Sequence, residues 1–208
     1  MDNAEGSSGS VTKLSEIQEA VLVGTLLGDG CLAKHGRYHR LHVKHALAHR
    51  SLAEFKHRVF GNFVSMPLHC FDQRLKGRRF PCVQFASRTN PVFTLWHDRF
   101  YETGRKCVPA DVGDALTPLA LAVWLMDDGA ADYAGVTFQT HCFSFEEVCH
   151  LGNVLEESFG LAISLRKNRG SWIIYVKAQS VECLRGAVDK YLLPEFVYKV
   201  VPRRTRTP

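Results

Sequence analysis

Two apolar segments of this chain end in the same dipeptide, Asp-Gly, and they constrain its fold more than any other feature. They read AVLVGTLLGDG at 20–30 and LALAVWLMDDG at 119–129, so their final aspartates, Asp29 and Asp128, lie 99 residues apart. Each segment is apolar on almost every face, which is typical of a helix that is buried on all sides. The chain is therefore expected to fold around two buried helices.

A second landmark repeats in the same order. The tetrapeptide Lys-x-Val-Pro begins at Lys106 and again at Lys199, 93 residues later. Two landmarks that recur in one order at nearly one interval indicate an internal duplication, with a unit of roughly 95 residues. We therefore expect four parts: a disordered Gly/Ser-rich leader, two subdomains and a basic tail. Their bounds are 1–12, 13–110, 111–201 and 202–208.

Both copies predict the same elements. A capping box at Ser15 and Gln18 begins the first helix, and Thr117 with Pro118 begins its counterpart. An alternating strand follows each Asp-Gly, and then come an amphipathic helix, a hairpin and a final helix. The strands are expected at 38–45 and 133–141, the amphipathic helices at 51–63 and 144–160, and the turns at 76–77 and 168–170. This order predicts an α+β fold.

Composition limits the class of protein. The 208 residues carry a formal net charge of +5, which is compatible with a nucleic-acid partner but does not prove one. No apolar run approaches the roughly 20 residues of a membrane span. The seven cysteines form no CxxC pair and mostly lie in apolar patterns. We expect them to be buried, reduced thiols in an intracellular compartment, with the cytoplasm and an organelle both open.

A helix that ends in Asp-Gly can simply have a glycine C-cap, and a single occurrence would favour that interpretation. Here the ending occurs twice, at the same point of a duplicated unit. If the two buried helices pack together, both carboxylates meet beside two negative helix ends. Such an arrangement needs protons or cations, and hard divalent cations prefer oxygen ligands. The sequence therefore predicts a divalent-metal site of the kind that hydrolyses phosphodiesters.

The motifs LVGTLLGDG at 22–30 and LAVWLMDDG at 121–129 resemble the signature helices of the LAGLIDADG homing endonucleases in their two-motif, single-chain form. With FSFEEV after the second motif and the Lys-x-Val-Pro endings, the resemblance covers about 15–201. It points to the LAGLIDADG DNA endonuclease branch, which includes a yeast mitochondrial intron-encoded enzyme. It implies two pseudo-symmetric αββαββα subdomains, with paired motif helices at their interface and two antiparallel sheets that form a saddle over DNA.

The resemblance assigns the metal site. Asp29 and Asp128 would bind the metal ions, helped by the backbone carbonyls of Gly28 and Asp127. Because Asp127 aligns with Gly28, we expect its carbonyl to matter more than its carboxylate. The chain departs from the motif at two positions. The third position, a glycine in the motif, is Val123 in the second copy, and the sixth, an acidic residue in the motif, is Leu27 in one copy and Met126 in the other. These departures change helix packing but remove no expected ligand.

The resemblance also assigns catalytic side chains outside the motifs. Lys106 and Lys199 would stabilise charge on the phosphate or organise solvent, one in each half. A water-positioning residue would fall on His45 in the first copy and on His141 in the second. The five histidines in 35–49 fit no zinc pattern, because strand alternation divides them between two faces.

Basic and amide side chains in the strands and hairpin tips are expected to contact DNA, although any one of them could be ordinary solvated surface. In the first copy these are Arg40, His42, Lys44, Arg74, Lys76, Arg78, Arg79, Gln84 and Arg88. In the second they are Thr137, Gln139, Arg166, Lys167, Arg169 and Lys177. Arginine and glutamine can read base edges in the major groove, whereas lysine neutralises phosphate.

These observations predict a monomeric, pseudo-dimeric endonuclease that cuts both strands of a long, asymmetric double-stranded DNA site with Mg²⁺. Mn²⁺ is expected to substitute, and Ca²⁺ to support binding without cleavage. No protein partner or membrane is expected. Two alternatives on the same fold stay open: an intron RNA maturase, and a DNA-binding protein that does not cleave. The intact acidic pair favours the nuclease.

Overall fold

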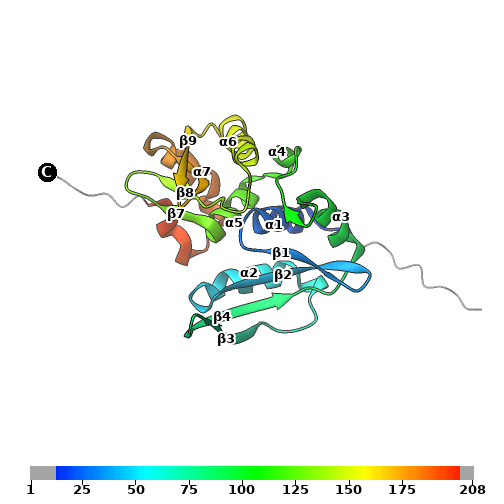
Figure 1. Cartoon of the computed structure of the whole chain (residues 1–208). Helices are drawn as coiled ribbons and strands as arrows, with labels where there is room; N and C mark the ends of the chain where they lie inside the picture. Colours follow the sequence, from blue (N-terminus) through cyan, green and yellow to red (C-terminus); the bar gives the residue numbers. More distant parts are fainter. Residues whose placement is uncertain (1–12, 202–208) are drawn as a thin grey trace, which may run out of the picture.

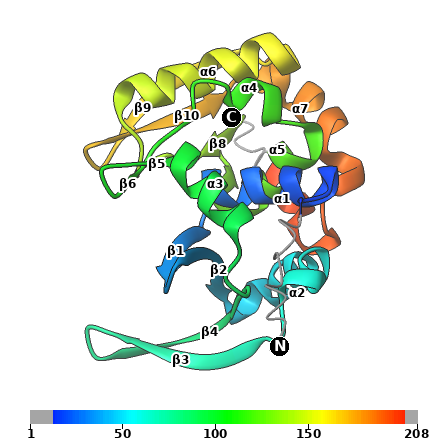
Figure 2. The same cartoon turned by 90° about the vertical axis from the view of Figure 1, so that its right-hand side faces the viewer.

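The computed structural model describes residues 13–201, so the predicted leader at 1–12 and tail at 202–208 lie outside the described residues. Two copies of one αββαββα unit follow each other along the chain (Figures 1 and 2). The first contains α1 (Glu16–Leu27), β1 (Cys31–His35), β2 (Tyr38–Ala46), α2 (Arg50–Val59), β3 (His69–Leu75), β4 (Arg78–Ala86) and α3 (Pro91–Phe100). The second contains α5 (Pro118–Asp128), β7 (Gly129–Ala131), β8 (Val136–Phe138), α6 (Phe145–Phe159), β9 (Ile163–Asn168), β10 (Ser171–Val176) and α7 (Val181–Val188). The predicted fold is confirmed.

Shorter elements complete the two copies. Between the copies lie β5 (Tyr101–Glu102), β6 (Arg105–Lys106) and α4 (Val112–Ala115). The 3₁₀ segments are η1 (Leu47–His49), η2 (Gly61–Phe63), η3 (Ala178–Ser180), η4 (Asp189–Tyr191) and η5 (Pro194–Val200). We refer to residues 16–106 as the first half and to residues 112–200 as the second half.

The two halves carry four-stranded antiparallel sheets with corresponding strand orders, β1-β2-β4-β3 and β7-β8-β10-β9. The register corresponds as well. Cys31 pairs with His42 in the first sheet, and Ala130 pairs with Thr137 in the second. Cys31 and Ala130 each stand two residues after the motif aspartate of their half. The pseudo-symmetry therefore relates individual residues of the two sheets.

Both predicted hairpin turns are present, and their backbone explains their sequence. Lys76 and Gly77 have φ values of 47° and 75°, and Arg169 and Gly170 have φ values of 51° and 89°. A two-residue loop with positive φ at both positions is a type I′ turn, which matches the twist of the flanking strands. Glycine in the second position allows this conformation without steric cost.

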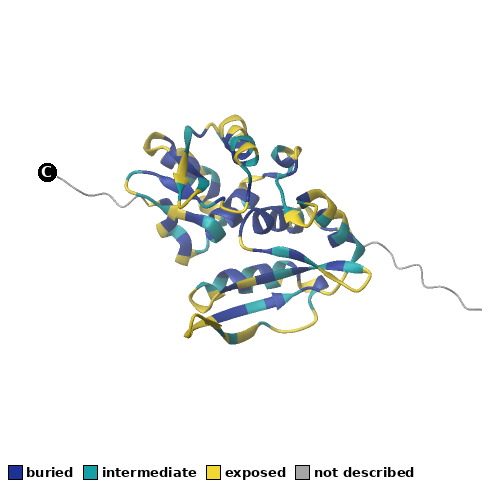
Figure 3. Cartoon of the chain, in the orientation of Figure 1, coloured by how far each residue is buried: buried dark blue, intermediate teal, exposed yellow. Residues whose placement is uncertain are grey.

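The motif helices α1 and α5 pack side by side at the centre of the molecule, where Figure 3 shows them as buried. Residues 21–27 and 120–126 are all buried. The two helices are in close contact at Gly24: a Cβ there would overlap the carbonyl oxygen of Ala120 and lie 2.7 Å from the Cβ of Val123. Only one helix contributes a glycine at this contact, and Val123 of the other helix fills the space it leaves.

The predicted helix starts are confirmed. Ser15 and Ser144 close capping boxes at α1 and α6, and Thr117 caps α5. The helix predicted at 51–63 is shorter, because α2 ends at Val59 and Gly61–Phe63 forms a separate 3₁₀ turn. Glycine has low helix propensity, which favours this break. None of the helices within residues 13–201 is long and apolar enough to cross a membrane.

The expectation that the cysteines are buried is wrong. All seven are unpaired thiols, and only Cys82 is buried. Cys70 lies on the edge strand β3, and Cys183 lies on α7 away from its buried residues. Both are exposed, because a cysteine that has apolar residues beside it in the sequence can still lie on the solvent-facing side of its strand or helix.

Candidate active site

The two motif aspartates lie where the paired helices end. Gly28 is the C-cap of α1 and Asp29 follows it, while Asp128 is the last residue of α5. The Asp29 side chain is 51% exposed, and Asp128 is partly buried. The backbone N–H of Asp29 donates to Oδ2 of Asp127, the neighbour of Asp128, at 3.4 Å. Helix packing therefore brings the ends of both motifs together. We refer to this region, where the C-terminal ends of α1 and α5 meet between the two halves, as the seam.

Two lysines close the C-terminal ends of the motif helices. Nζ of Lys106 donates to the carbonyls of Gly28 and Gly30 at 3.0 and 2.7 Å. Nζ of Lys199, in η5, donates to the last carbonyls of α5 at 3.3, 2.5 and 3.2 Å, those of Leu125, Met126 and Asp127. A cation at a helix C-terminus offsets the negative end of the dipole. The lysines thus already occupy the carbonyls that the resemblance assigns to the metal ions.

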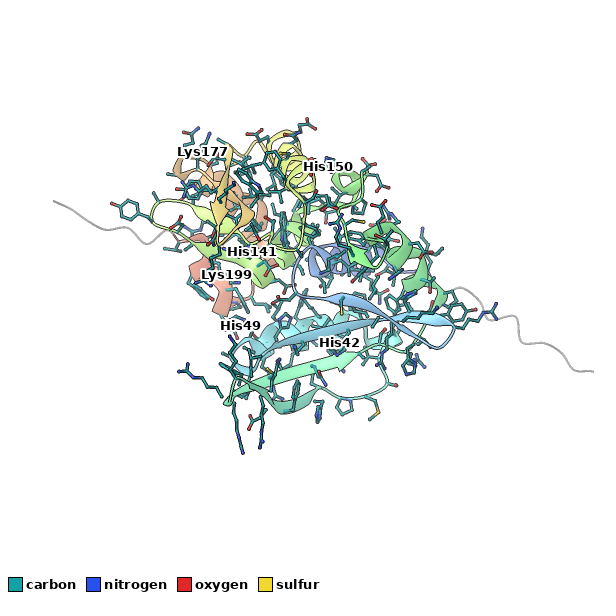
Figure 4. All side chains as sticks on the ribbon, in the orientation of Figure 1. His42, His49, His141, His150, Lys177 and Lys199 are labelled. Atoms are coloured by element: carbon teal, nitrogen blue, oxygen red, sulfur yellow. The ribbon has the colours of Figure 1, made fainter. Side chains whose placement is uncertain are left out.

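Burial distinguishes the two lysines. Lys199 is only 4% exposed, and Figure 4 shows it where the two halves meet, in the same region as His49 and His141. Burial lowers the pKa of Lys199, although the charges of the nearby aspartates oppose the shift. Lys106 is partly exposed. The second half therefore holds its lysine in a drier environment than the first.

A third lysine reaches the site from α2 and was not predicted. The Lys56 side chain is fully buried, and its Nζ lies 2.7 Å from both carboxylate oxygens of Asp127, whose side chain is fully buried as well. This ion pair joins the two halves. Breaking a buried pair typically costs about 3–5 kcal/mol. The Asp127 carboxylate, expected to matter less than its carbonyl, is therefore a structural anchor.

The sequence does carry a signal for Lys56. It stands four residues after Leu52 and three after Ala53, both of which are buried on α2. A lysine on the apolar face of an amphipathic helix needs a buried partner. Asp127, at the end of an otherwise apolar helix, is the matching acid, but only the tertiary structure shows that the two meet.

His45 lies between the carboxylates of Asp29 and Asp127. It is 4% exposed, with Nδ1 3.7 Å from Oδ2 of Asp29 and Nε2 3.7 Å from Oδ1 of Asp127. Its Nε2 also lies 3.4 Å from Nζ of Lys56. The structure thus places His45 beside a motif aspartate, and its role in positioning water stays a prediction.

His141 does not occupy the corresponding place. The strand register makes Thr140 the counterpart of His45, and His141 that of Ala46. Thr140 is buried and donates from Oγ1 to the carbonyl of Trp172 at 2.7 Å. His141 is exposed and, within residues 13–201, makes no side-chain hydrogen bond or ion pair. His141 thus lies one residue beyond the position that corresponds to His45 when the register is counted on from β8, and a catalytic role for His141 stays a prediction.

The two motif aspartates differ in acidity. Burial alone would raise the pKa of Asp29, but the hydrogen bond with His45, together with the charges of Lys56 and Lys106, lowers it below its ordinary value. Burial and the negative charges of Asp29 and Asp127 raise the pKa of Asp128 to about 7. Near neutral pH, Asp29 is ionised while Asp128 is partly protonated.

The residues at the seam fit a hard divalent cation. In the described part of the chain, the Asp128 carboxylate has no hydrogen-bonding or ion-pairing side chain, and its charge is raised in energy by Asp29. Single ligand atoms of Asp29, His45 and Asp127 also lie within 4.8 Å of one another. Asp127, however, is already neutralised by Lys56. Asp29 and Asp128 are therefore the stronger candidates for metal ligands.

The outer face of the first sheet, opposite α2, carries predicted DNA contacts. Arg40, His42 and Lys44 alternate with buried residues of β2, and Gln84 of β4 lies opposite Lys44. Figure 4 shows His42 on this sheet. An open pocket on the same face is lined by Arg40, His42, Gln84 and, beyond the strand, Arg88. Four of the predicted DNA contacts therefore line one pocket, and Lys44 lies beside it on the same face.

Strand register divides the predicted contacts of the β3–β4 hairpin. Arg78 shares the face of Gln84, and Lys76 is at the exposed tip. Arg74 and Arg79 lie opposite each other on the other face. DNA that lies on the outer face could therefore contact Arg78 and Lys76, but not Arg74 and Arg79.

The second sheet is less open. On its outer face, the Arg166 guanidinium carbon lies 3.2 Å from the centre of the Tyr175 ring, and Nη1 lies 3.2 Å from Oδ2 of Asp132. Lys167 points to the opposite face, where its Nζ lies 5.3 Å from the centre of the Trp172 ring. Arg166 is thus held over the outer face, whereas Lys167 is directed away from it.

The other predicted contacts of the second half are spread out. Thr137 is 7% exposed and donates to the carbonyl of Ala130, while Gln139 is partly exposed at the end of β8. Arg169 is at the hairpin tip. Lys177 follows β10, and Figure 4 shows it well away from His141 and the seam.

Comparison with known proteins agrees with this geometry. The family model described as the LAGLIDADG DNA endonuclease family matches residues 19–184. The chain is 26% identical over 215 residues to cytochrome b mRNA maturase bI2 of Saccharomyces cerevisiae, covering 96% of this chain and 51% of that protein. It is 29% identical over 199 residues to probable intron-encoded endonuclease 1 of Wickerhamomyces canadensis, covering 91% and 86%. The chain thus spans about half the length of the yeast maturase.

A solved structure shows the same architecture. The homing endonuclease I-WcaI, bound to its DNA recognition sequence, superimposes with a TM-score of 0.87 at 28% sequence identity, covering 93% of this chain and 89% of that one. The duplicated αββαββα unit, the paired motif helices and the match over most of the sequence agree. This chain belongs to the LAGLIDADG DNA endonuclease family.

Proposed function

We propose that this protein is a site-specific homing endonuclease that cleaves both strands of a long, asymmetric double-stranded DNA site by Mg²⁺-dependent hydrolysis. The observation that carries the proposal is the convergence of Asp29 and Asp128 at the ends of two buried helices. Two carboxylates at neighbouring helix ends repel each other and are stabilised by a divalent cation. Mn²⁺ would substitute for Mg²⁺, and Ca²⁺ would support binding alone.

The side chains around the acids have separate roles in this proposal. Asp29 and Asp128 would hold Mg²⁺, which would activate water and balance charge on the scissile phosphate. Lys106 and Lys199 hold the last carbonyls of the motif helices and place positive charge where the transition state gains negative charge. His45 orients Asp29 from the first half.

DNA would lie across the outer faces of both sheets. The first half presents an open polar surface formed by Arg40, His42, Lys44 and Gln84. On the second half, the Arg166 side chain is held against the Tyr175 ring, and its neighbours are mostly buried. Because these surfaces differ, the two halves of the DNA site would differ in sequence. The subdomains at 13–110 and 111–201 would thus act as one monomer on an asymmetric target.

A randomised DNA library tests the proposal directly. Incubation with Mg²⁺ should select a long site that is cut in both strands, and the same site should be bound uncut in Ca²⁺. Asp128→Asn should retain most of the affinity and lose cleavage, because it removes one metal ligand but keeps the shape of the side chain. Full cleavage by Asp128→Asn in Mg²⁺ would contradict the metal assignment.

An RNA maturase is a second candidate, favoured by one observation. The yeast relative that aligns with 96% of this chain is named a cytochrome b mRNA maturase. A splicing assay with an intron-containing transcript would separate the two activities, since Asp128→Asn should abolish DNA cleavage and leave splicing unchanged. The names of the intron-encoded relatives favour an organelle over the cytoplasm as the site of action.

A further inference from the structure

Lys56 uses all its hydrogen-bonding capacity inside the seam. An ammonium group has three N–H donors and no acceptor. Its three close polar neighbours are Oδ1 and Oδ2 of Asp127, each at 2.7 Å, and Nε2 of His45 at 3.4 Å. Each neighbour can take one donor. Lys56 is therefore placed to fix two side chains at once, one from each half.

The contact with His45 has a consequence for its tautomer. Since an ammonium group only donates, a hydrogen bond between Lys56 and His45 requires Nε2 to accept, and the single hydrogen of the neutral ring then resides on Nδ1. Nδ1 is the atom that faces Oδ2 of Asp29 at 3.7 Å. Lys56 thereby directs an N–H group of His45 toward the motif aspartate of the first half.

Asp127 provides a second route from Lys56 to Asp29. The carboxylate that Lys56 holds accepts from the backbone N–H of Asp29 at 3.4 Å. The Asp29 side chain is thus oriented from two directions, through its own backbone and through His45. Both routes begin at Lys56, which touches neither Asp29 nor solvent.

The second half has no counterpart of this arrangement. Thr140 replaces His45 in the register and is engaged with the Trp172 carbonyl. The helix α6, which corresponds to α2, contains no lysine or arginine. Asp128 therefore stands without the support that Asp29 receives, although the sheets around both residues are related by pseudo-symmetry.

We propose that Lys56 is a positioning residue for the half of the active site that is built on Asp29: it orients His45 and Asp127, and through them Asp29, so that the two DNA strands are cut at non-equivalent centres. The strand-specific part rests on the proposed nuclease function. The arrangement of Lys56, His45 and Asp29 does not, because it is a property of the free protein.

The first experiment needs no DNA or metal. Two-bond ¹H–¹⁵N NMR of histidine-labelled protein reports which ring nitrogen carries hydrogen, and His45→Gln identifies the His45 signals. At pH 8 the wild type should show hydrogen on Nδ1, and Lys56→Met/Asp127→Asn should lose this preference. The double variant is used because Lys56→Met alone would leave Asp127 buried without a partner. A wild type with hydrogen on Nε2 would overturn the proposal.

The second experiment measures the initial nicking rate of each strand on an end-labelled duplex that carries the selected site. Lys56→Met/Asp127→Asn should change the ratio of the two rates by about 10- to 100-fold, since small misplacements of reacting groups have effects of this size. Arg50→Met is the matched control: it lies on the same helix and loses only an exposed pair with Glu54. It should keep the wild-type ratio.

The outcomes separate the two proposals. Equal slowing of both strands, or an unchanged ratio in the folded double variant, would assign Lys56 a purely structural role and overturn the inference. Absence of cleavage by the wild type on any selected DNA would overturn the nuclease function instead. The NMR result would then still decide whether Lys56 sets the tautomer of His45.

Discussion

Lys199 donates from Nζ to the carbonyl of Met126 at 2.5 Å, so a lysine 73 residues further along the chain closes the last turn of the motif helix α5. Lys106 closes α1 in the same way through Gly28. The second occurrence of Lys-x-Val-Pro is thus the partner of the second occurrence of Asp-Gly. The two landmarks recur together because each lysine neutralises the helix end of its own half.

Lys199→Met should destabilise the protein more than Lys106→Met does. Methionine keeps the apolar stem of the side chain but removes the ammonium group, which leaves the last carbonyls of α5 without their donor. We expect a loss of about 1–3 kcal/mol in the free energy of unfolding, measured by urea titration without metal. Lys106 is more exposed, so water can replace its donor. A larger loss for Lys106→Met would contradict this difference in burial.

Asp128→Asn should stabilise the metal-free protein, with a gain that depends on pH. The pKa of Asp128 rises from an ordinary value of 3.8 to about 7 in the fold. Between these values the folded protein keeps a proton that the unfolded chain has released, so stability falls as pH rises and levels off above about 7. The Tm difference between variant and wild type, measured in EDTA, should grow from pH 4 to 7. A difference that does not vary with pH would contradict the assignment.

Mg²⁺ should make the wild type more stable than Asp128→Asn. Added to the wild type at pH 8, it should raise the Tm, because binding to the folded state alone is stabilising. The rise should shrink below pH 7, where a proton competes for Asp128. Asp128→Asn should show a much smaller rise at either pH. An equal rise in the variant would place the metal elsewhere in the chain.

Gly24→Ala should be strongly destabilising. The added Cβ would overlap the Ala120 carbonyl and press on Val123, so the motif helices would have to move apart. Overpacking of this kind typically costs about 1–3 kcal/mol. Gly186→Ala on α7 is the matched control, because its Cβ would meet nothing within 4 Å and alanine favours a helix. Chemical denaturation should show opposite signs for the two variants, and equal effects would contradict this packing.

Lys44→Ala should weaken DNA binding, and Lys167→Ala should not. Lys44 is exposed on the outer face of the first sheet, whereas Lys167 is directed to the opposite face over Trp172. Removing one phosphate contact should lower the slope of log affinity against log salt concentration by about 1. Titrations in Ca²⁺ at several salt concentrations measure this slope. A similar decrease for Lys167→Ala would place DNA on the other face.

Local sequence determined the architecture of this protein. The recurrence of Asp-Gly and Lys-x-Val-Pro revealed the duplication, and near-uniform apolarity showed that α1 and α5 are buried. Capping boxes at Ser15 and Ser144, and glycines in two-residue turns, located helix starts and hairpins. These features act through backbone conformation and burial over a few residues, so they can be recognised without knowing what packs against them.

Only the tertiary structure decided which side chains contact one another in the site. Lys56 and Asp127 are 71 residues apart, and neither shows in its local sequence that it faces the other across the seam. The equivalence of His45 with Thr140 rather than His141 depends on strand register, where a shift of one residue moves a side chain to the opposite face. The orientation of Arg74, Arg79 and Lys167 follows from the same alternation. Charges in the active site are set by distances and burial between segments, which arise only when the two halves pack together.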